Sequence, residues 1–135
     1  MTCEWKRLRA SDVMNCGLQW ADPKENLRAA ANRMAEHRIR ALLVVGATEN
    51  DLPGILSSKD IVNLVGAHDI DVLDQLHVDD ACTRPAICVP ETASIFDSIN
   101  LMRMSGVRRV PVLRGSAVVG ILSLSDIFDR LLTTR

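Results

Sequence analysis

The chain has 135 residues, 47% of them hydrophobic and 24% charged, and its formal net charge is −1. A nearly neutral chain with 3% aromatic residues and no tyrosine lacks the basic field and the stacking surfaces that nucleic-acid-binding proteins use. No apolar run approaches the roughly 20 residues that span a bilayer, and residues 1–4 do not begin like a signal peptide. We therefore expect a cytoplasmic protein that binds neither nucleic acid nor membrane. Its apolar composition indicates that another chain covers part of its surface.

Residues that could support catalysis or bind a metal are scattered. The histidines are not spaced as a metal set, and neither a nucleophile elbow nor a Walker A loop occurs. The four cysteines contain no C-x-x-C pair, which fits a reducing compartment: Cys3, Cys16, Cys82 and Cys88. The sequence thus predicts no enzyme and no metal site.

The first third of the chain predicts a strand, a helix and a second strand. Residues 1–11 are polar and predict an N-terminal arm, and an extended stretch is expected from Asp12 to Trp20. A helix is predicted to begin at Asp22, because a proline and an acid follow at the spacing of an N-cap. Its apolar stripe is Leu27, Ala30, Ala31 and Met34. The unbroken apolar run 41–45 then predicts a strand buried on both faces.

The next part predicts a turn over residues 46–53, a short strand and a second helix. Gly54-Ile55-Leu56-Ser57 reads as the strand, and Ser58-Lys59-Asp60 begins the helix. The apolar face of this helix is expected to be Ile61, Val62, Leu64 and Val65. Residues 66–76 predict a linker that can hold a short helix.

The second half of the chain repeats the sequence pattern of the first half. Gly54-Ile55-Leu56-Ser57-Ser58-Lys59-Asp60 returns as Gly120-Ile121-Leu122-Ser123-Leu124-Ser125-Asp126. Earlier positions also repeat, since Asp12 matches Asp80 and Met34 matches Met102. Internal similarity of this kind indicates a duplicated structural unit. The predicted repeats are residues 12–65 and 77–135.

Each repeat reads strand, helix, strand, strand, helix, which predicts an α+β fold of two β-α-β-β-α units. One such unit would leave a face of its small sheet uncovered. We therefore expect the two repeats to pack sheet to sheet with pseudo-twofold symmetry and a cleft on each side.

The duplicated G-h-x-S-x-x-D motif and the segment Val107-Arg108-Arg109-Val110-Pro111-Val112 resemble a tandem pair of cystathionine-β-synthase (CBS) domains, a Bateman module. The resemblance covers about residues 12–131. It implies a regulatory module that binds an adenosine-containing ligand (AMP, ADP or ATP, or NAD or S-adenosylmethionine), requires no other cofactor and pairs into a homodimer. Because the chain carries no recognisable effector domain, a regulatory role requires a separate partner protein.

The repeated motif suits a ribose. A carboxylate can accept two hydrogen bonds from vicinal hydroxyls, so Asp60 and Asp126 are the candidate ribose ligands. Ser57 and Ser123 can donate to a ribose or phosphate oxygen, and a helix N-terminus favours an anion. The alternative is that both pairs merely cap helices.

In similar modules the other repeat holds the adenine. Carried over by alignment, one site combines Asp60 with Thr83, Ile87, Val107 and Arg108, and the other combines Asp126 with Asn15, Gln19, Ile39 and Arg40. Lys59 and Arg109 add positive charge to the first site, whereas Ser125 and Ala41 stand at the matching positions of the second. We therefore predict tighter nucleotide binding at Asp60. The remaining alternative is an interaction module whose clefts stay empty.

Overall fold

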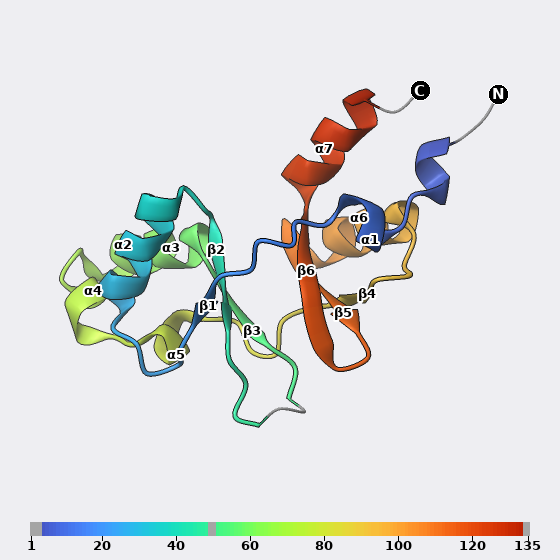
Figure 1. The fold of residues 1–135 in the computed structure, drawn as a ribbon. Coiled ribbons are helices and arrows are strands. Elements are labelled where there is room, and N and C mark those ends of the chain that lie inside the picture. The colour runs from blue at the N-terminus through green and yellow to red at the C-terminus, as the bar shows by residue number, and fades with distance from the viewer. Residues whose placement is uncertain (1–3, 49–50, 134–135) are drawn as a thin grey trace. The chain divides into compact units, whose positions relative to one another are not determined.

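The computed structural model describes residues 4–48 and 51–133, and the chain divides into two compact units (Figure 1). The first-repeat unit is Gln19–Ala86, and the second-repeat unit combines Met1–Leu18 with Ile87–Arg135. Each unit has its own three-stranded sheet and its own core. The predicted α+β fold of two β-α-β-β-α repeats is confirmed. Cys3 lies outside the described residues.

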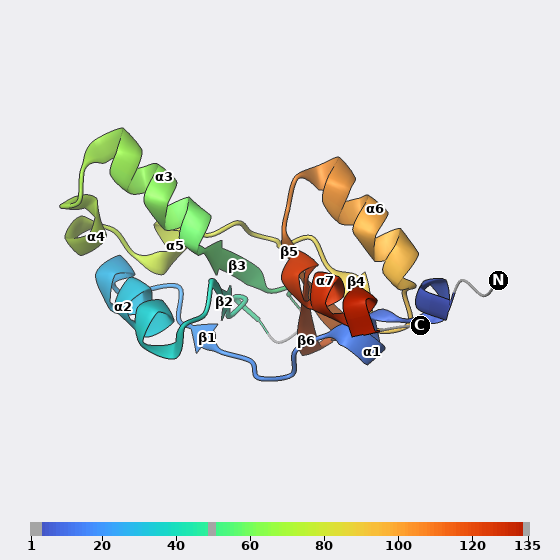
Figure 2. The same ribbon diagram turned by 90° about the horizontal axis from the view of Figure 1, so that it is seen from above.

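The first-repeat unit orders its sheet β1-β2-β3, with β1 parallel to β2 and β2 antiparallel to β3. Its elements in chain order are β1 (Trp20–Ala21), α2 (Leu27–His37), β2 (Ala41–Val44), β3 (Gly54–Ser57), α3 (Ser58–His68), α4 (Val72–Gln75) and α5 (Val78–Ala81). Helices α2 and α3 lie side by side (Figure 2). Apolar side chains from both helices and from β2 and β3 form the core, among them Leu27, Ala30, Met34, Leu42, Val44, Leu56 and Ile61.

The second-repeat unit has the same sheet order, β4-β5-β6, with β4 parallel and β6 antiparallel to β5. Its elements in chain order are η1 (Glu4–Arg7), α1 (Ala10–Val13), β4 (Val89–Pro90), α6 (Ile95–Ser105), β5 (Arg109–Arg114), β6 (Ala117–Ser123) and α7 (Leu124–Thr133). The core residues are Ala10, Val89, Ile95, Met102, Val110, Val112, Leu122 and Ile127.

The predicted start of the first long helix is wrong. The helix begins at Leu27, and Asn26 is its N-cap, with its side chain accepting the amide of Ala29. The Asp22 carboxylate instead accepts the amide of Lys24 at 2.8 Å. A short polar side chain that bonds two residues ahead stabilises a turn, and it competes with helix capping at that position.

Two further expectations differ from the structure. Asp12 and Val13 are helical rather than extended, because the Asp12 carboxylate accepts the Arg9 amide at 2.8 Å and closes a turn. Val62 was expected on the apolar face of the second helix, yet it is 67% exposed. Only Ile61, Leu64 and Val65 of that group pack on the core.

The segments outside the predicted repeats also contribute to the cores. Trp5 and Leu8, from the stretch expected to be an arm, pack against the second core. In addition, the Leu8 carbonyl accepts the amide of Ile95 at the start of α6. Within the stretch expected to be a linker, Val72 and Leu73 of α4 are buried in the first core. Both segments are therefore integral to the folded units.

Candidate functional site

Each copy of the repeated motif lies where a strand runs directly into a helix. Strand β3 ends at Ser57 before α3, and β6 ends at Ser123 before α7. The Ser57 hydroxyl accepts the Asp60 amide at 3.2 Å, and the Ser123 hydroxyl accepts the Asp126 amide at 3.0 Å. Both serines therefore cap their helices, so the capping role that the sequence left open is present in both repeats.

The two aspartates are held differently. Oδ2 of Asp60 accepts the Ser57 amide at 2.8 Å, which completes a reciprocal capping box. Within the described residues, the Asp126 carboxylate accepts no hydrogen bond. Both side chains are half-buried. Asp60 thus has a fixed orientation and one carboxylate oxygen to offer, whereas both oxygens of Asp126 are available.

A polar residue flanks the free edge of each motif strand. Thr83 exchanges backbone hydrogen bonds of 2.9 and 3.0 Å with Ile55, and Asn15 exchanges bonds of 2.8 and 2.9 Å with Ile121. Ile55 and Ile121 stand two residues before the capping serines, so their neighbours lie near the start of each helix. The structure therefore places Thr83 in the unit of Asp60 and Asn15 in the unit of Asp126, although the sequence assigned each of them to the opposite repeat.

The glycine that opens each motif permits this close approach. A Cβ atom on Gly54 would lie 3.2 Å from the Thr83 carbonyl oxygen. On Gly120 it would lie 2.5 Å from Sδ of Met14, the residue before Asn15. A larger residue would displace the flanking segment, so the glycines help to position the polar edge residues.

Two arginines lie closer to the motif of their own repeat than the alignment suggested. The carbonyl of Arg40 accepts the Ser58 amide at 2.8 Å, and the carbonyl of Arg108 accepts the Leu124 amide at 2.9 Å. Both side chains are exposed. Each arginine thus lies beside the first turn of α3 or α7, a proximity that the sequence analysis did not predict.

The remaining predicted residues occupy varied environments. Ile39 and Val107 pack against the core of their own repeat, Arg109 lies in β5 opposite Ser123, and Lys59 is exposed. Gln19 extends β1, since its carbonyl accepts the Leu43 amide, and Ile87 is 38% exposed. Apart from Thr83, the partners assigned to Asp60 belong to the second-repeat unit, and apart from Asn15, those assigned to Asp126 belong to the first. Their cooperation stays a prediction.

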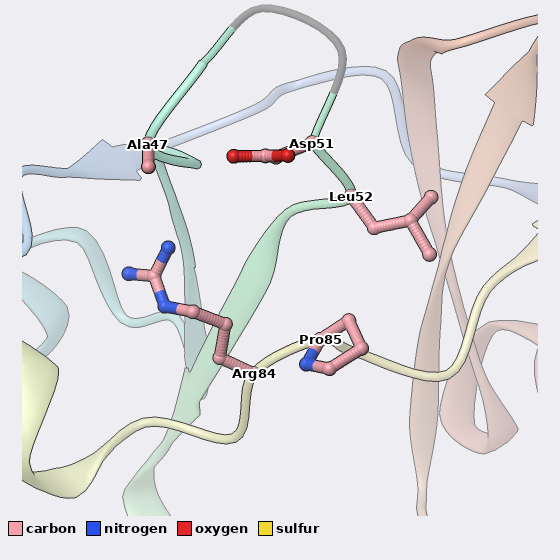
Figure 3. Close-up of a pocket in the computed structure, with 5 residues that line it drawn as sticks. All are labelled: Ala47, Asp51, Leu52, Arg84 and Pro85. Atoms are coloured by element: carbon pink, nitrogen blue, oxygen red, sulfur yellow. The ribbon is translucent and has the colours of Figure 1, made fainter.

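A cavity of about 450 Å³ in the first-repeat unit contains none of the predicted site residues. Its lining residues are Ala47, Asp51, Leu52, Arg84 and Pro85 (Figure 3). The Arg84 guanidinium donates to the Val45 carbonyl at 3.2 Å and to Asp79 at 3.1 Å. Arg84 therefore links the segment between β2 and β3 to α5, which is a structural role.

Residues 4–48 and 51–133 were also compared with the expectations for metal ligands, reactive cysteines and membrane-spanning helices. No three histidine, cysteine or acidic side chains among them lie close enough to hold a metal ion. Burial raises the pKa of the Cys82 and Cys88 thiols, so both remain protonated near neutral pH and are poor nucleophiles. No described helix has the length and apolar character needed to cross a membrane.

The family model for the CBS domain matches this chain twice, over residues 10–67 and 78–133. The chain belongs to the CBS domain family. Pairs of CBS domains are regulatory modules and are generally not catalytic. The resemblance that rested on the repeated motif is thereby confirmed.

The comparisons with known proteins give the same result. Hypoxic response protein 1 of Mycobacterium tuberculosis is 36% identical over 118 residues, which are 87% of this chain and 81% of that protein. The hexameric CBS-CP12 protein of bloom-forming cyanobacteria matches with a TM-score of 0.85 at 28% identity. That match covers 90% of this chain and 66% of the longer cyanobacterial chain.

A third match concerns a structure with bound ligands. The CBS domain pair of the protein MJ0100, in complex with 5′-methylthioadenosine and S-adenosylmethionine, matches with a TM-score of 0.78. The match covers 93% of this chain and 96% of that chain at 23% identity. At this identity the match shows the shared fold alone.

Proposed function

We propose that this protein is a regulatory module that binds an adenosine-containing ligand at the Asp60 and Asp126 motifs. The ligand class is AMP, ADP or ATP, or NAD or S-adenosylmethionine. One observation carries the proposal: each repeat presents a half-buried carboxylate with an available oxygen in the first turn of a helix. A serine hydroxyl and a polar strand-edge residue, Thr83 or Asn15, accompany it.

The available oxygens suit the ribose, and the helix N-termini suit a phosphate. A carboxylate accepts hydrogen bonds from both ribose hydroxyls, while the first turn of α3 offers amides and a partial positive charge. The exposed side chains of Lys59 and Arg40 stand near that turn. At α7 the lysine is replaced by Ser125. We therefore propose that the Asp60 site prefers phosphorylated ligands and binds them more tightly than the Asp126 site. A CBS pair of this fold is known with two adenosine compounds bound, as in MJ0100.

Calorimetric titration of AMP and ATP into Asp60→Asn and Asp126→Asn tests the proposal. The asparagine retains an amide oxygen that can accept the Ser57 amide, so the cap is preserved while the charged acceptor is lost. We expect each variant to lose about ten- to a hundredfold in affinity at its own site, the value of a hydrogen bond to a charged acceptor.

Asp97→Asn is the matched control. Asp97 lies in the first turn of α6, and its amide donates to the hydroxyl of Ser94, in the same Ser-x-x-Asp spacing. It lies outside the repeated motif, so its substitution should leave binding unchanged. Equal affinities in all three variants and the parent would overturn the assignment of the ligand site.

The alternative function is an interaction module that binds no ligand. The capping box of Asp60 favours it, because this carboxylate already has a structural role without a ligand. Thermal unfolding with AMP, ADP, ATP, NAD and S-adenosylmethionine separates the two functions. A ligand at a hundred times its Kd stabilises the folded state by about 2.7 kcal/mol. If any of the five ligands stabilises the protein, the ligand-binding function is supported. If none of them does, the interaction module is supported.

We also propose that the protein acts as a homodimer in the cytoplasm and passes its ligand state to a separate effector protein. Two observations support the dimer: the apolar residues exposed on the helices, and the hexameric assembly of the cyanobacterial CBS-CP12 protein.

A further inference from the structure

The cavity of the first-repeat unit lies between two segments that hydrogen bonds hold in place. One is the turn between β2 and β3, where the Asp51 amide donates to the Thr48 carbonyl at 3.1 Å. In return, the Asp51 carboxylate accepts the Thr48 amide at 3.0 Å. A Cβ atom on Gly46 would lie 2.8 Å from Cβ of Asp51, so glycine is needed for the turn to close. The Asp51 side chain therefore has a fixed position at the cavity.

The second segment runs from Thr83 to Ala86 along the free edge of β3. Thr83 exchanges two backbone hydrogen bonds with Ile55, and the Ala86 amide donates to the Pro53 carbonyl at 2.9 Å. Arg84 lies between these two anchors. Both walls of the cavity are therefore formed by the chain itself, without a ligand.

Groups of opposite charge lie across the cavity from each other. The Asp51 carboxylate is on one side and the Arg84 guanidinium on the other (Figure 3). The apolar part of the lining is Ala47, Leu52 and Pro85. Among the described residues these two charged groups form no ion pair with each other, and Oδ1 of Asp51 accepts no hydrogen bond. One carboxylate oxygen is therefore available to a ligand.

Arg84 has donors available as well. A guanidinium carries five N–H groups. Contacts with the Val45 carbonyl, the Asp79 carboxylate and the Cys82 thiol account for three of those of Arg84. These contacts orient the guanidinium plane and leave two donors. The cavity thus combines a charged acceptor with charged donors.

The second repeat lacks this pair of charges. Counted from the matched motif glycines and strand-edge residues, Ala117 stands where the first repeat has Asp51, and Cys16 stands where it has Arg84. The turn is also shorter, since β5 ends at Arg114 and β6 begins at Ala117. The same sheet therefore forms without the two charges, so the repeat fold does not require them.

We propose that this cavity binds a small zwitterion, namely an amino acid with an apolar side chain. The ammonium group pairs with Asp51, the carboxylate pairs with Arg84, and the side chain contacts Leu52 and Pro85. A volume of about 450 Å³ lies within the range of roughly 300–1,000 Å³ for small-ligand sites, in which a few polar groups in an apolar lining fix the orientation of the ligand. A nucleotide would place its phosphates beside the Asp51 carboxylate, so it suits this cavity poorly. The inference goes beyond the proposed nucleotide binding and does not rest on it.

Titration of L-leucine into the isotope-labelled protein, followed by NMR spectroscopy, tests the inference. We expect saturable shifts of the amide signals of Asp51, Leu52 and Arg84. Isoamylamine has the leucine side chain without the carboxylate, and isocaproate has it without the ammonium group. Each should bind at least about tenfold more weakly than leucine, the value of one hydrogen bond to a charged group. A fragment that binds as tightly as leucine would overturn the paired recognition.

Isoleucine, valine, methionine and phenylalanine are titrated in the same way, since the lining does not select one apolar side chain. The inference is overturned if none of the five amino acids produces saturable shifts at the cavity.

Substitutions then locate the site. Asp51→Asn keeps an oxygen for the Thr48 amide but loses the charge, and Arg84→Gln loses the opposite charge. Each should weaken leucine binding at least about tenfold. The matched controls Asp129→Asn and Arg103→Gln change exposed residues of the second-repeat unit and should leave binding unchanged. Equal leucine affinity in Asp51→Asn and the parent would exclude this cavity as the site.

Two crossed titrations separate this site from the proposed nucleotide site. Asp60→Asn should leave the leucine shifts unchanged, and Asp51→Asn should leave AMP binding unchanged. Loss of the leucine shifts in Asp60→Asn would place leucine at the repeated motif and overturn the inference. A protein that binds leucine at the cavity but no nucleotide would contradict the proposed function alone.

Discussion

Gly120→Ala is the substitution whose effect follows most directly from the structure. A Cβ atom at this position would lie 2.5 Å from Sδ, 2.7 Å from Cγ and 3.0 Å from Cβ of Met14. Real Cβ contacts are not as short as those to Sδ and Cγ, and the contact to the Cβ atom of Met14, which cannot move without its backbone, is tighter than most. The segment that carries Asn15 must therefore shift away from β6. Overpacking of this kind costs about 1–3 kcal/mol of unfolding free energy.

Whether Gly120→Ala raises or lowers the unfolding free energy shows whether the clash with Met14 exists. Gly120 does not have a left-handed backbone conformation. Without the clash, alanine would therefore stabilise the protein by about 0.4–1 kcal/mol, because it lowers the conformational entropy of the unfolded chain. Urea denaturation of Gly120→Ala, of Met14→Ala and of the double variant measures the coupling between the two positions. We expect the single glycine variant to be destabilised and Met14→Ala to relieve most of that cost. A neutral or stabilised Gly120→Ala, or additive effects, would refute the tight contact between the two segments.

Three further substitutions probe other parts of the second-repeat unit. Ser94→Ala removes the N-cap of α6 and should cost about 1 kcal/mol in urea denaturation, whereas a cost near zero would show that the cap is dispensable. The Arg114 guanidinium lowers the pKa of Glu91 below its ordinary value of 4.5, so the pair stabilises the fold above that pH and this stabilisation is lost as the pH falls through the lowered pKa. The Tm of Glu91→Gln should therefore lie below that of the parent at pH 7 and converge with it in strong acid; a constant difference would contradict the linkage. Trp5→Ala removes a ring whose centroid lies 6.0 Å from that of Phe96, and it should lower the stability of this unit while hydrogen exchange in α2 and α3 is unchanged.

The fold could be predicted because the duplication supplied each weak local signal twice. The buried strand expected over residues 41–45 is β2, and the repeated motif is a strand that runs into a helix in both copies. The helix start at Asp22 failed because aspartate and proline suit a turn as well as an N-cap. Exposure of Val62 could not be read from periodicity, since a residue at the border of an apolar stripe is buried only where a neighbouring element covers it.

The local geometry around the candidate site could be predicted in part. The serine and the aspartate of each motif could be identified from the sequence, since strand, cap and helix are local features. The positions of Arg40 and Arg108 follow from the antiparallel pairing of β2 with β3 and of β5 with β6. In an antiparallel pair, the residue before the first strand lies opposite the end of the second strand. An alignment with other CBS pairs matches residues along the sequence and does not show which residues of two paired strands lie opposite each other. The different hydrogen bonding of Asp60 and Asp126 depends on side-chain orientation, which the sequence does not encode locally.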